Sequence, residues 1–292
     1  MFDKYKNLAP EECAKTIKKD MIKVFVIYII ALIIIVSMFL KVQFSLIDLL
    51  YDDYTSVFDM YDFIDGIIDV DMAIWFIACI TVMIIAVLVK QNAYIGIFYN
   101  LCDPEKYIQS ELIRYKKCPK LLHVKSRRIS LGYAYLSLND YENAWNYLKY
   151  LVPSNISKCK NVRILNALAD YYYETGDKDA FSLYKDQMDA LAKSGNKNIA
   201  LLVAINNYDA RIALDAKRYD EAKELYKKYL GNKRLSKITK TNYYYILGKI
   251  AYDNGDYIDA VYYLKNALES GSKLPFAADA KEMLESITKK FF

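Results

Sequence analysis

The sequence lacks the motifs from which most catalytic sites are built. It has one histidine, His123, in a basic stretch, and no G-x-S-x-G, H-E-x-x-H, Walker or G-x-G-x-x-G motif. A Ser-His-Asp or Cys-His site would have to use His123, which has no nucleophile motif beside it. Carboxylates are plentiful, but on helix surfaces they are usually solvated. We therefore predict that the protein is not an enzyme and that it uses no cofactor.

Paired cysteines and strongly basic clusters are also missing. The five cysteines are scattered and no two form a C-x-x-C pair, which argues against a disulfide framework and a zinc site. Free thiols in a reducing compartment are the expected state. The net charge of +5 is modest, and no nucleic-acid motif accompanies it. We predict neither a metal nor a nucleic-acid partner.

Charge is absent from two long stretches near the N-terminus. Residues 24–40, extended by 21–23, reach the roughly 20 residues that span a bilayer, and residues 72–89 meet the same criterion. A cleaved signal peptide would need a small-x-small site after the first stretch, and there is none. A buried helix pair of a soluble protein is the other alternative. Two such stretches so close together favour transmembrane helices over about 22–40 and 72–89.

Lysine and arginine placement predicts the orientation of this hairpin. The N-terminal arm, 1–23, has six lysines and residues 90–128 have nine Lys or Arg, whereas the loop 41–71 has one Lys and eight Asp. The positive-inside rule puts both termini in the cytoplasm and the acidic loop outside. Abundant Lys, Ile, Asn and Tyr are compatible with an AT-rich bacterial genome. We expect a multi-pass protein of a bacterial cytoplasmic membrane.

The acidic loop has two interpretations. Its apolar residues fall on one helical face and its aspartates largely on the other, which favours an amphipathic segment at the outer interface. The alternative is a calcium or partner site that uses Asp62, Asp65, Asp69 and Asp71. Their spacing does not give the D-x-D-x-D-G calcium loop, so the metal reading is the weaker one.

Residues 242–268 contain a helix, a turn and a second helix. Leu247-Gly248 and Ala251 lie on the first helix, Gly255-Asp256-Tyr257 forms the turn, and Ala260 and Ala267 line the second helix. The stretch resembles the tetratricopeptide repeat (TPR) family, in which small residues let the two helices approach closely. A generic helical hairpin is the alternative.

Similar but weaker matches precede it. The first covers residues 125–151; in the second, around 165–184, the turn is read as one residue short and Ala180 as the small residue after it. The third has Asp209 where the family has Leu. The small residues Gly132, Ala169, Ala210 and Gly248 lie 37, 41 and 38 positions apart. The resemblance covers roughly residues 125–290.

The fold class that follows is all-α: a two-helix transmembrane hairpin, then a TPR-like α-solenoid of about four helical hairpins plus a capping helix. The predicted domains are a basic arm (1–23), the hairpin (24–92), connecting helices (93–124) with Asp103 as an N-cap, and the repeat domain (125–292). Residues 275–292 would cover the open end of the stack.

The resemblance implies a partner site on the concave face. The predicted partner-binding residues are Tyr133, Arg163, Asn166, Asp170, Tyr173, Asn207, Arg211, Tyr245, Lys249 and Tyr252, with Ser126, Ile129, Tyr208 and Asn242 as further inward positions. Asn can bond a peptide backbone, and Tyr and Arg are frequent anchors. Ile129 and Tyr133 stand where a carboxylate clamp for a C-terminus needs Lys and Asn, so such a clamp is not expected; the expected ligand is an internal peptide or helical segment or the surface of a folded partner. The alternative is an empty groove of ordinary solvated residues.

Three functions fit these features. The first is a membrane-anchored adaptor or scaffold that binds a protein partner through its repeats. The second is a structural subunit of a membrane complex, whose hairpin and acidic loop make the main contacts. The third is a sensor in which the outer loop reports to the repeats.

Overall fold

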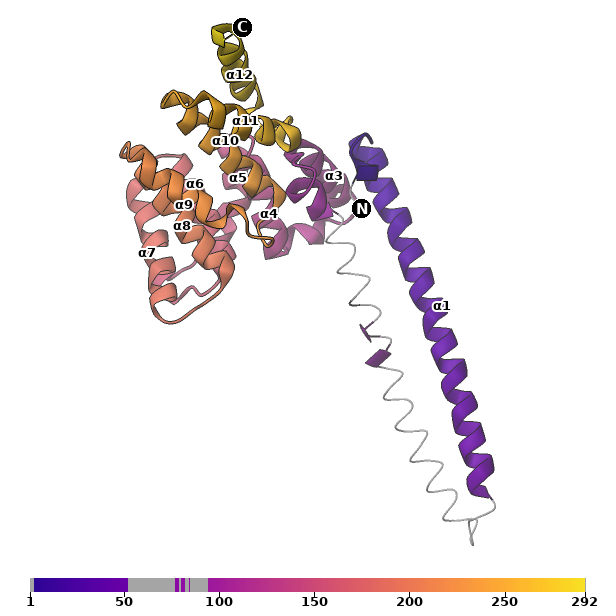
Figure 1. Ribbon diagram of the computed structural model, residues 1–292. Helices are drawn as coiled ribbons and strands as arrows, with labels where there is room; N and C mark the ends of the chain where they lie inside the picture. Colours follow the sequence, from indigo (N-terminus) through magenta and orange to yellow (C-terminus); the bar gives the residue numbers. More distant parts are fainter. Residues whose placement is uncertain (1–2, 52–76, 79, 82–83, 85–93, 292) are drawn as a thin grey trace. The chain divides into compact units, whose positions relative to one another are not determined.

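The computed structural model describes residues 3–51, 77–78, 80–81, 84 and 94–291. The acidic loop from residue 52 onward and most of the predicted second transmembrane helix lie outside these residues. The chain divides into two compact units, Met1–Glu11 with Ile95–Phe292, and Glu12–Tyr94. Within the described residues the secondary structure is helical, with no strand, which confirms the all-α class (Figure 1).

Helix α1 (Pro10–Tyr51) is the described helix that is long and apolar enough to cross a membrane. It begins with Pro10, a residue suited to the first helical turn, where no backbone N–H is needed. The helix is longer than the predicted span of 22–40, and residues 41–51, predicted to open the outer loop, are helical. No glycine or proline interrupts the stretch after residue 40, so nothing local ends the helix there.

Helix α3 (Pro104–Lys117) starts as the sequence predicts. The Asp103 carboxylate accepts a hydrogen bond from the Lys106 N–H, and Pro104 occupies the first turn. This confirms Asp103 as the N-cap. Short 3₁₀ helices at Asp3–Tyr5, Pro119–His123, Lys149–Leu151 and Ile156–Lys158 lie outside the main helices.

The rest of this unit is a succession of helix pairs. In each pair the two helices pack against each other, and each pair also packs against the next. The pairs are α4 (Lys125–Leu136) with α5 (Tyr141–Leu148), α6 (Val162–Glu174) with α7 (Lys178–Lys193), α8 (Ile199–Asp215) with α9 (Tyr219–Leu230), and α10 (Lys237–Asp253) with α11 (Tyr257–Gly271), followed by α12 (Ala277–Phe291).

One turn geometry recurs in all four pairs. The residue two positions before each second helix has a positive φ: 60° at Asn139, 78° at Gly176, 58° at Lys217 and 77° at Gly255. The next N–H bonds back to a carbonyl five residues earlier, as from Asp256 to Ala251, which is the Schellman pattern. In three of the turns this next residue is an aspartate that caps the following helix: Asp140, Asp177 and Asp256.

The second pair corrects one prediction. Asp177 follows Ala169 by the same eight positions that separate Asp256 from Gly248, so its turn is not one residue short. The difference lies in α7. In α7, Phe181 lies four residues after the cap Asp177, as Ala260 lies four residues after the cap Asp256 in the last pair, and Phe181 is 8% exposed. The sequence prediction aligned Ala180 with Ala260, which made the turn appear one residue short; the equivalent residue is Phe181.

Close helix contact depends on small residues in the first helix of each pair. A Cβ on Gly132 would lie 2.4 Å from Leu148 Cδ2, and a Cβ on Gly248 would lie 2.7 Å from Leu264 Cγ. Both leucines are fully buried. The glycines therefore set how closely the two helices of these pairs pack.

We expect Gly132→Ala to destabilise the protein. The added methyl group overlaps buried Leu148, and such overpacking costs about 1–3 kcal/mol, which outweighs a helix-propensity gain of up to about 1 kcal/mol. The control is Gly231→Ala, where nothing lies within 4 Å of the added atom and the φ of −74° suits alanine. Thermal unfolding followed by circular dichroism should show a lower Tm for the first variant only. Equal Tm values would contradict the packing argument.

Candidate binding cavity

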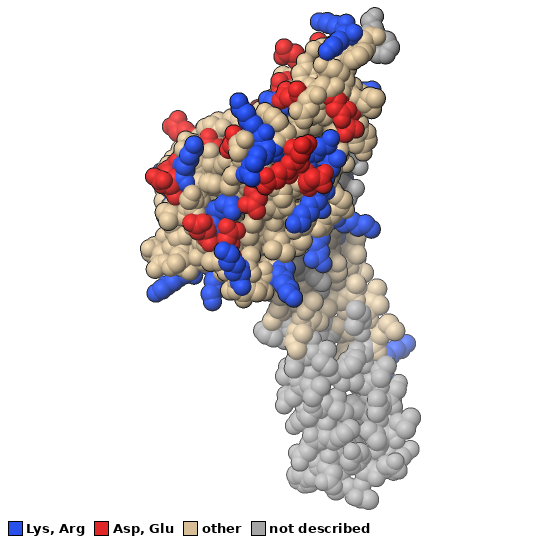
Figure 2. Space-filling view, turned by 60° about the vertical axis from the view of Figure 1, so that its left-hand side comes forward, with Lys and Arg blue, Asp and Glu red and all other residues tan. Residues whose placement is uncertain are grey.

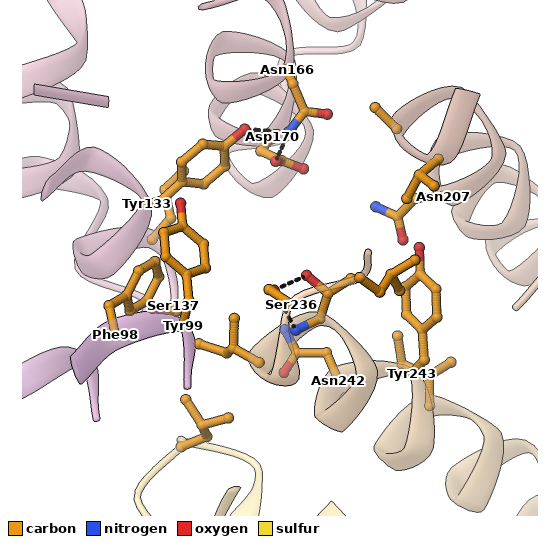
Figure 3. Close-up of a pocket in the computed structure, with 18 of the residues that line it drawn as sticks. Phe98, Tyr99, Tyr133, Ser137, Asn166, Asp170, Asn207, Ser236, Asn242 and Tyr243 are labelled. Atoms are coloured by element: carbon orange, nitrogen blue, oxygen red, sulfur yellow. Dashed lines mark hydrogen bonds between the residues drawn. The ribbon is translucent and has the colours of Figure 1, made fainter. Parts of the chain in front are cut away.

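The first helices of the pairs surround a cavity of about 800 Å³ (Figure 3). Its lining comes from α4, α6, α8 and α10, from the loop before α10, and from two segments outside the pairs that contain Phe98 and Phe276. All of these residues belong to the unit that includes Ile95–Phe292. The size falls within the roughly 300–1,000 Å³ of ligand-binding pockets.

Seven of the ten predicted partner-binding residues line this cavity. They are Tyr133, Arg163, Asn166, Asp170, Asn207, Arg211 and Tyr245, and Asn242 lines it as well. Most of the positions predicted to face inward therefore share the lining of one cavity. Whether these residues bind a partner remains a prediction.

The other three predicted residues do not line it. The hydroxyl of Tyr173 donates to Asp215 at 2.8 Å, Tyr252 pairs with Ser286 at 2.9 Å, and Lys249 is exposed elsewhere on α10. Ile129 and Tyr208, also expected to face inward, are core residues that are 2% and 0% exposed. Tyr173 and Tyr252 lie near the C-terminal ends of α6 and α10, where each hydroxyl bonds to the element that follows in the array rather than facing the cavity.

Several lining residues were missed because the repeat pattern says nothing about them. Phe98 and Tyr99 precede the first pair, Arg234 lies in the loop before α10, and Phe276 and Asp279 follow the last pair. Phe276 stacks on Tyr245 with ring centroids 4.5 Å apart, and Tyr245 donates a hydrogen bond to Asp279. No local sequence signal marks these residues as part of one site.

A hydrogen-bonded network spans the α4, α6 and α8 side of the cavity. The Asn166 amide donates to the Tyr133 hydroxyl and, at 3.0 Å, to the Asp170 carboxylate. The Tyr208 hydroxyl donates to the backbone and side-chain oxygens of Asn166 at 3.0 and 3.1 Å. Figure 3 shows Tyr133, Asn166 and Asp170 meeting at this wall. The network holds three neighbouring helices in one arrangement.

Arg211 joins the same network through its charge. Its guanidinium lies 2.8 Å from Glu174 Oε1 and 3.8 Å from Asp170 Oδ1, and it covers the Tyr173 ring at 4.8 Å. Burial raises the pKa of Asp170 to about 6, and the opposing effect of Arg211 does not cancel it. Burial alone would lower the pKa of Arg211, but the carboxylates of Asp170 and Glu174 raise it. Arg211 is therefore mainly structural.

Other polar groups on the lining have no such bonds. Asn207 and Asn242 are partly buried, and their amide groups make no side-chain hydrogen bond within the described part of the chain. The Tyr243 hydroxyl is buried without a hydrogen-bond partner. Figure 3 labels Asn207 and Asn242 on the lining of the cavity, and the Tyr243 ring beside Asn207. Unmet hydrogen-bonding capacity on a cavity wall is what a polar ligand can satisfy.

The chemistry of the lining suits binding. The described lining includes no histidine, cysteine or lysine. The Ser137 hydroxyl donates to the Ala134 carbonyl oxygen, and the hydroxyls of Ser236 and Thr239 bond to each other. Within residues 3–51 and 94–291, with the few described between them, no three His, Cys, Asp or Glu residues could hold a metal ion. Basic and acidic side chains are interspersed over the face shown in Figure 2.

Comparisons with family models, curated proteins and solved structures each found no match, so the function has to be argued from this geometry.

We expect Asp170 to make the stability depend on pH. Its folded pKa of about 6 lies above the ordinary value, so the folded state holds a proton that the unfolded state has released between about pH 4 and pH 6. Stability from this group is therefore lost as the pH rises through that window. The Tm of the wild type should fall relative to that of Asp170→Asn between pH 4 and pH 7.

The control for this measurement is Asp215→Asn. Asp215 is exposed, and its carboxylate accepts a hydrogen bond from the Tyr173 hydroxyl. The Tm of this variant should follow the wild type across the same pH range. Parallel curves for Asp170→Asn and the wild type would show that Asp170 does not take up the proton.

Proposed function

We propose that the protein is a membrane-anchored adaptor that binds a segment of a protein partner in the cavity formed by its helix pairs. The observation that carries this proposal is the pair of partly buried amide groups on Asn207 and Asn242, which make no side-chain hydrogen bond within the described residues and line an 800 Å³ cavity. An amide side chain offers one acceptor and two donors, which match the groups of a peptide backbone. Apolar neighbours such as Phe98, Ile246 and Phe276 would receive side chains of that segment.

The TPR-like α-solenoid is the architecture that we propose for the cavity. Support comes from the recurring Schellman turn and from the small residues at equivalent positions: Gly132, Ala169, Ala210 and Gly248. Each pair packs on the next, as in repeat proteins, where a unit cannot bury its own face. Helix α12 would cap the last pair.

The anchor is proposed from α1 and from the sequence. The apolar part of α1 leaves large side chains such as Ile27, Ile30 and Ile33 exposed, at 52–64%, as lipid-facing residues would be. The second apolar stretch, 72–89, completes a transmembrane hairpin, and the Lys and Arg bias puts both termini in the cytoplasm. Holding the repeats at a bilayer raises the local concentration of the partner there.

The test of partner binding is Asn207→Ala combined with Asn242→Ala. Both side chains face the cavity without bonds of their own, so their loss should weaken partner binding at least tenfold and leave the fold intact. Affinity purification from solubilised membranes, followed by quantitative mass spectrometry, measures the loss. Arg211→Glu is a poor choice, because reversing a partly buried ion pair would damage the fold.

The matched control is Lys227→Ala combined with Lys265→Ala, two exposed residues of second helices that do not line the cavity. It should retain every partner. If the cavity variant and this control recover the same proteins in the same amounts, the cavity is not the contact surface. The hairpin would then be the place where partners bind.

Membrane anchoring has its own test. Ile30→Lys with Ile34→Lys puts two charges within the apolar part of α1, at a cost of about 2.5–3.5 kcal/mol each near the centre of the bilayer. We expect this variant to lose much of its membrane integration, measured as the fraction that resists alkaline carbonate extraction. Lys18→Gln with Lys19→Gln, outside the apolar stretch, should remain integrated. Full extraction of the wild type by carbonate would refute the anchor.

A further inference from the structure

The helix array has two edges, which differ in how the chain turns there. Each pair is a hairpin and successive pairs pack on one another, so the turns within the pairs lie along one edge and the connectors between the pairs along the other. Two contacts between pairs agree with this arrangement. The Tyr173 hydroxyl meets Asp215 where α6 and α8 end, and Lys223 Nζ lies 3.5 Å from Asp259 Oδ2 near the starts of α9 and α11. We call these edges the turn edge and the connector edge.

The connector edge carries positive charge. The connectors 118–124, 149–161, 194–198 and 231–236 contain seven Lys or Arg and no Asp or Glu. The helices α3, α7 and α9 add basic residues in the last turn before a connector. The first helices α4, α6, α8 and α10 have no acidic residue in the first turn after one. In Figure 2, Lys and Arg side chains follow the lower margin of the array, below the face where both signs are mixed.

The turn edge has the opposite bias. Each second helix has an acidic residue in its first turn, and no first helix has a basic residue in its last turn. The helix dipole accounts for acidic residues at helix starts. It does not account for Arg163 and Lys237 in the first turns of α6 and α10, because positive charge is unfavourable there. Helix stability therefore does not explain the positive connector edge.

The cations of the connector edge are exposed and have no carboxylate partner. Within the described part of the chain no ion pair involves Lys120, Lys158, Lys160, Lys197 or Lys233, all of which are exposed. Near the turn edge, by contrast, Arg218 pairs with Glu221 at 2.7 Å. The connector edge is thus a row of like charges that the protein does not neutralise itself, and such a row attracts an extended anionic surface.

The start of the proposed anchor reaches the array at this edge. Asp103 forms an ion pair with Lys273, which follows α11 at the connector edge. Lys106 lies 3.7 Å from the same carboxylate. Its ammonium donates to the carbonyl oxygens of Tyr5 and Lys6, at 3.1 and 2.7 Å, shortly before α1 begins. The segment that leads into α1 is therefore attached to the connector edge of the last pair.

We propose that the connector edge binds the anionic lipid headgroups of the bilayer that α1 crosses. This inference rests on the anchor of the proposed function and not on the cavity. The cytoplasmic surface of a membrane is negative and attracts basic segments close to the lipid. The charges of the edge are spread over four connectors and do not converge on one pocket, which suits a surface better than a compact ligand. Binding there would hold the array in one orientation on the membrane.

Lysine footprinting of the full-length protein in nanodiscs tests the proposal. The discs contain phosphatidylcholine, alone or with about 40% phosphatidylglycerol, and mass spectrometry follows the acetylation of each lysine by an N-hydroxysuccinimide ester. We expect Lys158, Lys197 and Lys233 to react at least about threefold more slowly in the anionic discs, because headgroups cover them. Lys178 and Lys217, exposed residues of the turn edge, should react equally in both discs. About 0.5 M NaCl should abolish the difference.

A charge variant separates the edge from the net charge. Lys158→Gln, Lys160→Gln and Lys233→Gln together should lower the protection of Lys197 to less than about half of the wild-type value. The control variant combines Lys178→Gln, Lys217→Gln and Lys265→Gln. It loses the same charge from exposed positions outside the connectors and should keep the full protection. Equal protection of Lys197 in the two variants would overturn the proposal.

The outcomes separate this inference from the proposed function. If the protein elutes with the discs but the connector lysines react alike in both lipids, lipid binding by this edge is overturned, and the anchor and the cavity stand. Equal slowing of the turn-edge lysines would also overturn it. A protein that does not enter the discs refutes the anchor and this inference with it. Protection by added duplex DNA, without protection by phosphatidylglycerol, would assign the edge to a nucleic acid and overturn the lipid proposal.

Discussion

The structure depends on how closely the two helices of each pair approach. At Gly132 and Gly248 the backbone of the first helix lies so near the second that a single methyl group would overlap a buried leucine. Ala169 and Ala210, both fully buried, occupy the equivalent positions in the other two pairs. Because the two helices of each pair lie close together, α4 packs on α6 and α6 on α8, while the last pair packs on the third through α9 and α10; the four first helices together line the cavity.

Polar side chains on the first helices divide into two groups with different roles. Asn166, Asp170 and Arg211 bond to one another and to neighbouring tyrosines, so they hold α4, α6 and α8 together. Asn207 and Asn242 make no side-chain bond and remain available to a ligand. Polar residues thus bond to one another and hold helices together in one part of the cavity, and have side-chain amides without such bonds in another. This division is the reason for probing function at the second group.

Helix α1 and the helix pairs place different demands on the sequence. For a helix that is to cross a bilayer, as we propose for α1, an uninterrupted apolar stretch is sufficient, since a helix satisfies its own backbone hydrogen bonds in lipid. In the array each pair has a turn and a small residue at fixed spacing, and three of the four second helices also begin with an aspartate cap. The apolar stretch of α1 is recognised by its hydropathy, and the helix pairs are recognised by the spacing of their turn, cap and small residues. The two patterns occupy different parts of the chain. The proposed adaptor function requires both, because one part would locate the protein and the other would bind its partner.

The sequence by itself determined the local features. It predicted the all-α class, the N-cap at Asp103, and the inward placement of residues such as Tyr133, Asn166 and Asn207, because caps and helical periodicity act over a few residues. Only the tertiary structure decided that Phe98 and Phe276 share one cavity, that Tyr208 is core, and that Asp103 meets Lys273. These features depend on the accumulated rotation from one helix pair to the next, which no single repeat encodes.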